Sequence, residues 1–156
     1  MRTGEEIVIL NDLVRATCHS ADRCAASGRA CGDGYRKVVI EQLCEDRRLL
    51  LVDLIRCLLL RGVPVPEVRK VITLVPMTVP AVADLDVIWI DVEIAERKLH
   101  RALRSALENP HLSDSVRELL SLHYLRFRLH HDELAGLAGQ RPLVDPLAAE
   151  PRVYNA

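Results

Sequence analysis

The fold is decided by residues 41–60, which read EQLCEDRRLLLVDLIRCLLL. No glycine or proline interrupts this stretch, and its apolar residues recur at steps of three and four, as in an amphipathic helix. We predict a long helix over residues 35–61 that stops at Gly62, because Pro64 prevents its continuation. The face that this helix turns to the core contains Ile40, Leu43, Arg47, Leu50, Leu51, Leu54 and Leu58.

The second half of this helix is apolar on its other face as well, at Leu49, Val52, Leu59 and Leu60. A helix that is apolar all round has to be covered on both sides. The segment 63–83 that follows is rich in proline, but its other residues are largely apolar, which does not suit a solvated linker. We predict a crossover over 63–83, with a short helix after Pro66, that lies against this second face.

Two more helices are predicted from start and stop signals. The first begins at the capping box Thr3-x-x-Glu6 and continues to about Gly28, with a core stripe of small residues. The other covers residues 84–108 and ends where Asn109 precedes a proline. Its core stripe contains Leu85, Ile88, Val92, Ala95, Leu99, Ala102, Leu103 and Ala106, and a second stripe contains Val87, Ile90 and Ile94.

The last helix is predicted to follow a cap region at residues 113–115. Ser115-x-x-Glu118 is a second capping-box match, and the pattern fades at Gly136. Residues 140–156 contain three prolines and no apolar period. We therefore predict a bundle domain over 1–139 and a flexible C-terminal tail over 140–156.

Together these segments predict an all-α fold. Short connections join the first helix to the second and the third to the fourth, whereas a long proline-containing crossover joins the second to the third. This order matches an up-down-down-up four-helix bundle of the ferritin-like kind, which has one long crossover.

Composition excludes several classes of function. Lys and Arg number 21 against 22 Asp and Glu, so the net charge of −1 offers no electrostatic basis for binding nucleic acid. No apolar stretch reaches the ~18 residues of a membrane span, and the N-terminus has no signal-peptide pattern. We expect a cytoplasmic protein with no nucleic-acid or membrane partner. Its five cysteines lack CxxC spacing, so we expect packed thiols rather than disulfides or a zinc site.

Acidic and histidine side chains are the candidates for chemistry. A di-metal bundle needs inward carboxylates and imidazoles, usually with Glu-x-x-His pairs on one helix face. The chain has one such match, Glu108 to His111, and Pro110 breaks the helix between them. A thinner set remains as a candidate site for iron, manganese or zinc: Asp46, Glu93, Glu96, His100 and His131. Its simpler interpretation is a layer of hydrogen-bonded and ion-paired side chains, in which Arg47 is buried and paired with Asp46 or with a carboxylate of 84–108.

Three stretches also carry a family resemblance: ILNDLV at 9–14, Glu41-x-Leu43-x-x-Asp46-Arg47-x-x-Leu50-x-x-Asp53-Leu54, and 124–132 with its terminal His131 and Asp132. Over residues 5–137 the chain resembles an uncharacterised bacterial family of ferritin-like four-helix-bundle proteins. The resemblance implies the bundle fold and an ancestry among carboxylate-bridged metal proteins, but it implies no activity.

Position by position, the resemblance implies that Asp46, Glu93 and His131 descend from metal-facing positions. Two positions depart from the pattern, because Ala21 and Arg128 stand where acids would be expected. A cation in place of a ligand anion opposes the binding of a metal ion.

Two functional hypotheses follow. The first is a non-enzymatic bundle with a degenerate metal site, which acts as a structural or protein-interaction module. It would form a homodimer through the second apolar stripes of the helices 35–61 and 84–108. The alternative is a metal-binding bundle with an oxidase or stress-related role.

Overall fold

The computed structural model describes residues 2–30, 34–73 and 85–137. Every regular element within these ranges is a helix: α1 (Arg2–Ala30), α2 (Gly34–Leu60), α3 (Val65–Thr73), α4 (Leu85–Glu108) and α5 (Asp114–Leu137). The fold is therefore all-α, as predicted. None of these helices combines the length and the apolar character needed to cross a membrane. The predicted tail over 140–156 lies outside the described residues.

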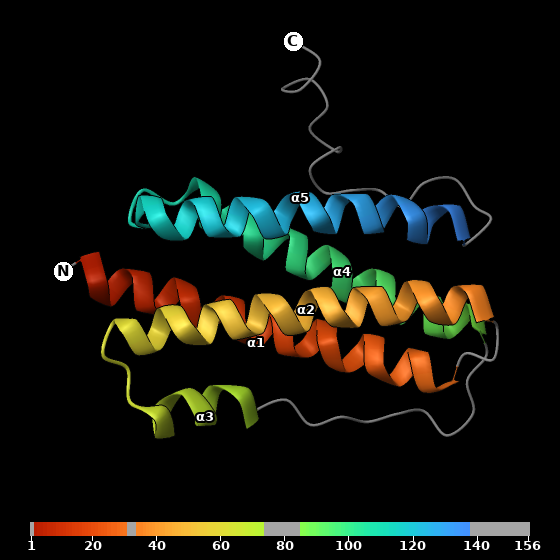
Figure 1. Cartoon of the computed structure of the whole chain (residues 1–156), viewed down its shortest axis with the longest axis horizontal. Helices are drawn as coiled ribbons and strands as arrows, with labels where there is room; N and C mark the ends of the chain where they lie inside the picture. Colours follow the sequence, from red (N-terminus) through yellow and green to blue (C-terminus); the bar gives the residue numbers. More distant parts are fainter. Residues whose placement is uncertain (1, 31–33, 74–84, 138–156) are drawn as a thin grey trace, which may run out of the picture.

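The four long helices pack side by side (Figure 1). α1 packs against α2 and α4, and α5 packs against the same two helices. Following the chain in Figure 1, α1 and α5 run in one direction, and α2 and α4 run in the other. The pairs α1/α5 and α2/α4 therefore occupy diagonal corners.

The helix predicted over 35–61 is confirmed as α2, within one residue at each end. The predicted stop at Gly62 is also confirmed. Gly62 has a φ of 82°, and its N–H donates a hydrogen bond to the carbonyl of Leu59 at 3.0 Å. A side chain is strained in this left-handed conformation, so glycine suits the position.

The short helix predicted in the crossover is confirmed as α3, with Pro66 in its first turn, where proline is well tolerated. α3 buries Val68 and Val71 and packs against α1 as well as α2. The predicted cover for the second face of α2 is not complete within the described chain, because Val52 and Leu59 each remain 42% exposed. The rest of the predicted crossover lies outside the described residues.

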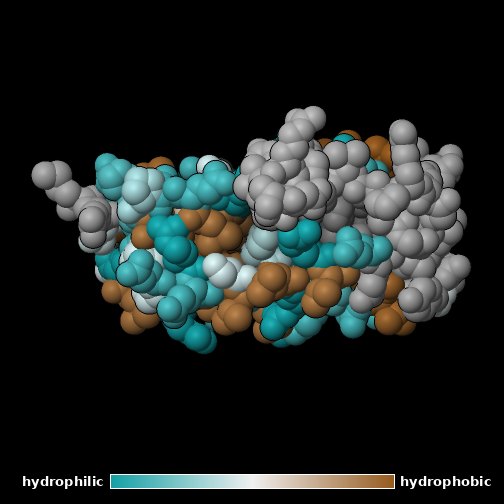
Figure 2. Space-filling model, turned by 90° about the horizontal axis from the view of Figure 1, so that it is seen from above, coloured by the Kyte–Doolittle hydropathy of each residue, from teal (hydrophilic) through white to brown (hydrophobic). Residues whose placement is uncertain are grey.

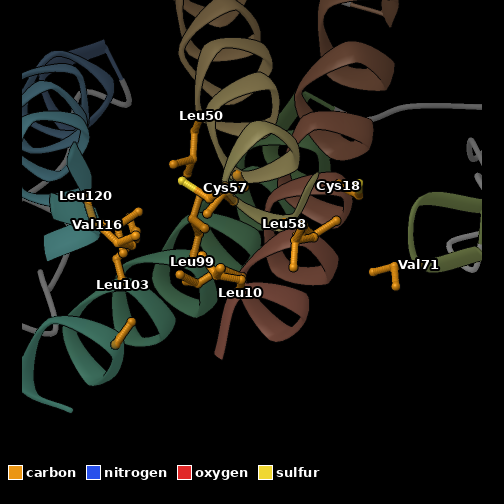
Figure 3. Close-up of a cluster of buried hydrophobic side chains, with 14 of the residues drawn as sticks. Leu10, Cys18, Leu50, Cys57, Leu58, Val71, Leu99, Leu103, Val116 and Leu120 are labelled. Carbon is orange, nitrogen blue, oxygen red and sulfur yellow. The ribbon is translucent and has the colours of Figure 1, made fainter. Parts of the chain in front are cut away.

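The main core is formed by apolar side chains from all the helices (Figure 3). In Figure 3, Val71 reaches inward from α3, and Leu99 and Leu103 project from α4 towards the other helices. Burying each such leucine contributes about 1.5–3 kcal/mol relative to leaving it exposed. The largest fully buried members of this core are Phe127, Leu10, Leu13, Leu50, Leu54, Leu58, Leu99, Leu103 and Leu120.

Both capping-box predictions are wrong. α1 begins at Arg2, so Thr3 lies within the helix, and the Glu6 carboxylate binds groups far along the chain. α5 begins at Asp114, so Ser115 is already helical. The predicted cap region at 113–115 is confirmed at Ser113, which is the N-cap, because its carbonyl accepts the first helical hydrogen bond, from Arg117 N–H at 2.9 Å.

Glu6 joins three helix ends. Its Oε1 accepts a hydrogen bond from Ser113 N–H at 2.8 Å, and its Oε2 accepts one from Arg61 Nε at 2.5 Å. Arg61 also donates to Ser113 Oγ at 3.1 Å and to the carbonyl of Cys57 at 3.0 Å. This clasp of Glu6, Arg61 and Ser113 fixes the start of α1 against the end of α2 and the start of α5.

The clasp also sets the acidity of Glu6. Burial acts to raise the pKa of this carboxyl, but hydrogen bonds from Arg61 and Ser113 outweigh it, so the net pKa is lowered. A lowered carboxyl pKa stabilises the fold above the pKa of the unfolded chain. This contribution is lost as the pH falls through the folded value.

We predict that Glu6→Gln lowers the free energy of unfolding by about 1–3 kcal/mol at neutral pH, because Arg61 loses a charged partner. The difference between wild type and variant should persist down to the ordinary glutamate pKa of 4.5 and disappear at lower pH. Urea unfolding at a series of pH values measures this. A difference that is unchanged at pH well below the ordinary glutamate pKa would contradict the assigned role of the carboxylate.

Candidate functional site

A buried ion pair lies at the centre of the four long helices. Arg47 on α2 pairs with Glu96 on α4, and both side chains are 0% exposed. Because α2 and α4 occupy diagonal corners, this pair spans the interior from one corner to the other. The predicted pairing of Arg47 with a carboxylate of 84–108 is confirmed. Asp46 is a more distant neighbour, with its Oδ2 at 4.0 Å from Arg47 Nη1.

The other two long helices complete the surroundings of the guanidinium. Ser20 on α1 accepts a hydrogen bond from Arg47 Nε at 3.1 Å and donates one to Glu96 Oε1 at 3.3 Å. Phe127 on α5 places its ring centroid 4.3 Å from the guanidinium carbon, which is a cation–π distance. Arg47 Nη1 also donates to the carbonyl of Leu43 at 3.2 Å. Every long helix thus contributes a group to this central cluster.

His100 extends the cluster along α4. It lies one turn after Glu96, with Nε2 at 3.7 Å from Glu96 Oε2, and its side chain is 1% exposed. Its ring packs near those of Tyr124 and Phe127, at centroid distances of 6.0 Å and 6.3 Å. The predicted proximity of Glu96 and His100 is confirmed, and both belong to the interior.

Two aspartate–histidine pairs link α2 to α5. His123 Nε2 lies 2.7 Å from Asp53 Oδ2, and His130 Nδ1 hydrogen-bonds to Asp46 Oδ2. Both partners step by seven residues along their helices, which is the register expected of two antiparallel helices in contact. Sequence reasoning missed these pairs, although the matching seven-residue spacing was a signal that could have revealed them.

The predicted metal-ligand set is only partly brought together. Glu96 and His100 are adjacent, Asp46 is engaged by His130, and Glu93 forms an ion pair with Arg97 towards the surface. The side chain of His131 is not among those described. Among the described side chains, no three acidic, histidine or cysteine groups are placed to hold one metal ion. The positive charge of Arg47 opposes the binding of two bridged metal ions, because it is already paired with the Glu96 carboxylate.

Two thiols lie beside the central cluster. Cys24 on α1 and Cys44 on α2 pack in one small apolar cluster with Ile40, Leu43 and Val92. The neighbouring Cys44 thiol and burial raise the pKa of Cys24, whereas the Cys24 thiol, assisted by Arg47, lowers the pKa of Cys44. Burial raises the pKa of Cys18 to about 11. The predicted free thiols are confirmed for the described cysteines, Cys18, Cys24, Cys44 and Cys57.

The outward face of α5 carries a leucine stripe that sequence reasoning also missed. Leu122, Leu125 and Leu129 are 67%, 61% and 67% exposed. They lie opposite the buried Leu120 and Phe127 on the same helix. Figure 2 looks onto the α5 side of the molecule and shows hydrophobic surface between hydrophilic groups there. On α4, Ile90 and Ile94 of the predicted second stripe are 53% and 45% exposed.

Comparisons of the chain with protein-family models, with curated proteins and with solved structures found no match. The resemblance to a ferritin-like family therefore stays a prediction.

We predict that Arg47→Met lowers the free energy of unfolding by about 3–5 kcal/mol, because it leaves the Glu96 carboxylate buried without its cation. The double variant R47M/E96L should recover most of this loss, since replacing both partners removes the unpaired charge. Denaturant unfolding of the two single variants and the double variant measures the coupling.

Arg97→Met is the matched control for this prediction. It breaks the partly exposed ion pair of Arg97 with Glu93 on the same helix as Glu96, and it should cost no more than about 1 kcal/mol. If the losses of the R47M and E96L single variants simply add in the double variant, the two residues are not coupled and the central ion pair is refuted.

Proposed function

We propose that this protein is a non-enzymatic bundle of the ferritin-like kind with a degenerate metal centre, which acts as a structural or protein-interaction module. The order of the helices supports the ferritin-like part of the proposal. Neighbouring helices are antiparallel, α2 and α4 are parallel across the diagonal, and the connection between them is the long one. One long crossover of this kind characterises ferritin-like bundles.

The observation that carries the proposal is the position of Arg47. In a di-metal bundle, inward carboxylates of facing helices balance the charge of the metal ions. Here the guanidinium of Arg47 reaches the centre of the interior, and Glu96 balances its charge instead. The protein itself therefore supplies the cation that a metal centre would supply.

The alternative, a metal-binding bundle, has one contact in its favour, the 3.7 Å approach of His100 Nε2 to Glu96 Oε2. However, the remaining predicted ligands fit it poorly. The Asp46 carboxylate is held by His130, and that of Glu93 by Arg97. Two ligands beside a fixed guanidinium are a weak site for a divalent cation.

Elemental analysis separates these two functions. We predict that the full chain, purified without chelator, retains far less than one iron, manganese or zinc ion per chain and binds none stoichiometrically on titration. An intact di-metal centre would instead give about two ions per chain. Stoichiometric metal that is weakened by His100→Ala would favour the metal-binding alternative and overturn the proposal.

The exposed leucine stripe of α5 supports the interaction part of the proposal. Leu122, Leu125 and Leu129 follow one another at steps of three and four, which is the spacing of the seam between two packed helices. A second copy of the chain presents the same stripe. Two identical stripes related by a twofold axis would cover each other.

The stripes of α2 and α4 are less suited to one shared interface. These helices lie at diagonal corners, so Val52 on α2 and Ile94 on α4 face away from each other. A flat partner surface can cover one of them at a time. We therefore assign the association to α5 and treat the α2 and α4 stripes as the competing surfaces.

We predict that the wild-type chain forms a dimer at micromolar concentration and that Leu125→Glu weakens it by at least tenfold, ~1.4 kcal/mol. The charged side chain would have to be buried in the seam. Size-exclusion chromatography with light scattering, over a range of concentrations, measures the mass.

Val52→Glu and Ile94→Glu are the matched controls, because each places the same charge on a competing apolar surface. Both should leave the dimer intact. A wild-type monomer at every concentration would refute self-association. Loss of the dimer in a control but not in Leu125→Glu would move the interface to α2 or α4.

A further inference from the structure

A pair of cysteine side chains lies where α1 and α2 face each other. Cys24 comes from α1 and Cys44 from α2, and the two thiols lie close enough for each to shift the pKa of the other. Both pack in a small apolar cluster that is separate from the main core and contains Ile40, Leu43 and Val92. Packing from α1, α2 and α4 therefore fixes both cysteines in one cluster.

The two thiols differ in their access to solvent. Cys24 is 0% exposed, whereas Cys44 is half-buried. A small solute can therefore reach Cys44 first, and Cys24 lies behind it, shielded from solvent. This arrangement of an accessible thiol with a second thiol poised next to it is the one found at reversible redox sites.

The polar surroundings of the pair suit a reactive sulfur. Arg47, one turn after Cys44 on α2, lies close enough for its positive charge to favour the thiolate form of both cysteines. A neighbouring cation stabilises the thiolate form, which is the nucleophile in thiol chemistry. By contrast, Cys18 and Cys57 are buried in the main apolar core.

We propose that Cys24 and Cys44 form a two-thiol redox site, which hydrogen peroxide or another small hydroperoxide oxidises to a disulfide that joins α1 to α2. This inference is independent of the proposed interaction function. It adds a chemical reaction that the central ion pair and the leucine stripe do not require.

The reaction is balanced in two steps. The Cys44 thiol first ionises, and its thiolate sulfur attacks one oxygen of the peroxide, so an S–O bond forms and the O–O bond breaks. Hydroxide leaves and combines with the proton that Cys44 released to become water. The Cys24 sulfur then attacks the Cys44 sulfenic acid, so the S–S bond forms and the S–O bond breaks. The proton of Cys24 leaves with the hydroxyl group as a second water. The two thiols lose two electrons, and the peroxide gains them.

The test uses the full, reduced chain treated with a small excess of hydrogen peroxide. Remaining thiols are alkylated, the alkyl groups are counted by intact mass, and the linked peptides are mapped without reduction. Of the five thiols, we expect three to be alkylated after oxidation. We also expect a peptide in which Cys24 is bonded to Cys44, and dithiothreitol should separate its two halves.

Serine variants give the controls. Cys24→Ser and Cys44→Ser should each abolish the linked peptide, whereas Cys18→Ser and Cys57→Ser, on the same two helices, should retain it. Cys31→Ser should retain it as well. Because the linked peptide is sought in the wild-type chain, the test does not depend on the folding of any variant. No loss of thiols, a disulfide through Cys31, or oxidation of Cys44 that stops at sulfinic acid would each overturn the proposal.

Discussion

A guanidinium in the middle of an apolar interior is tolerated only where an anion meets it. Removing an ion from water costs several kcal/mol even after relaxation, so Arg47 is stable at the centre of these helices because Glu96 reaches it from the diagonal corner. The pair in turn restrains the other corners. Ser20 on α1 hydrogen-bonds to both charged groups, and Phe127 on α5 presents its ring to the guanidinium.

The central polar cluster also divides the interior. The larger apolar core lies on the same side of this cluster as the clasp of Glu6, Arg61 and Ser113. The smaller apolar cluster, on the other side, contains the two thiols. The thiol pair is consequently close to the fixed positive charge of Arg47. The leucine stripe of α5, by contrast, faces the solvent. The proposed thiol chemistry and the proposed association would therefore use different helices, α1 and α2 for the first and α5 for the second.

Periodicity was sufficient to predict the helices, because the core face of a helix repeats within one segment. It also predicted that Arg47 is buried and paired, since a charge in the middle of an apolar stripe needs a partner. The partner of Asp46 is harder to predict from the sequence, because a choice between His130 and His131 depends on how α5 is rotated against α2. Likewise, the contact of Cys24 with Cys44 depends on the register of two helices. The Thr3 capping box failed because Glu6 has better partners far along the chain, and the Ser115 box failed because Ser113 is the N-cap. Spacing within one helix shows which residues can pair, as the seven-residue steps of the two Asp–His pairs do, but it does not fix the rotation of one helix against another.

We infer that the Arg47 guanidinium, rather than a metal ion, supplies the positive charge at the middle of the fold. Crystals grown with excess manganese and measured at an X-ray energy where manganese scatters anomalously test it most directly. We expect density for the Arg47 guanidinium between Ser20 and Glu96, with no anomalous peak inside the helices. An anomalous peak bound by Glu96 and His100, with Arg47 displaced from its carboxylate, would contradict the account.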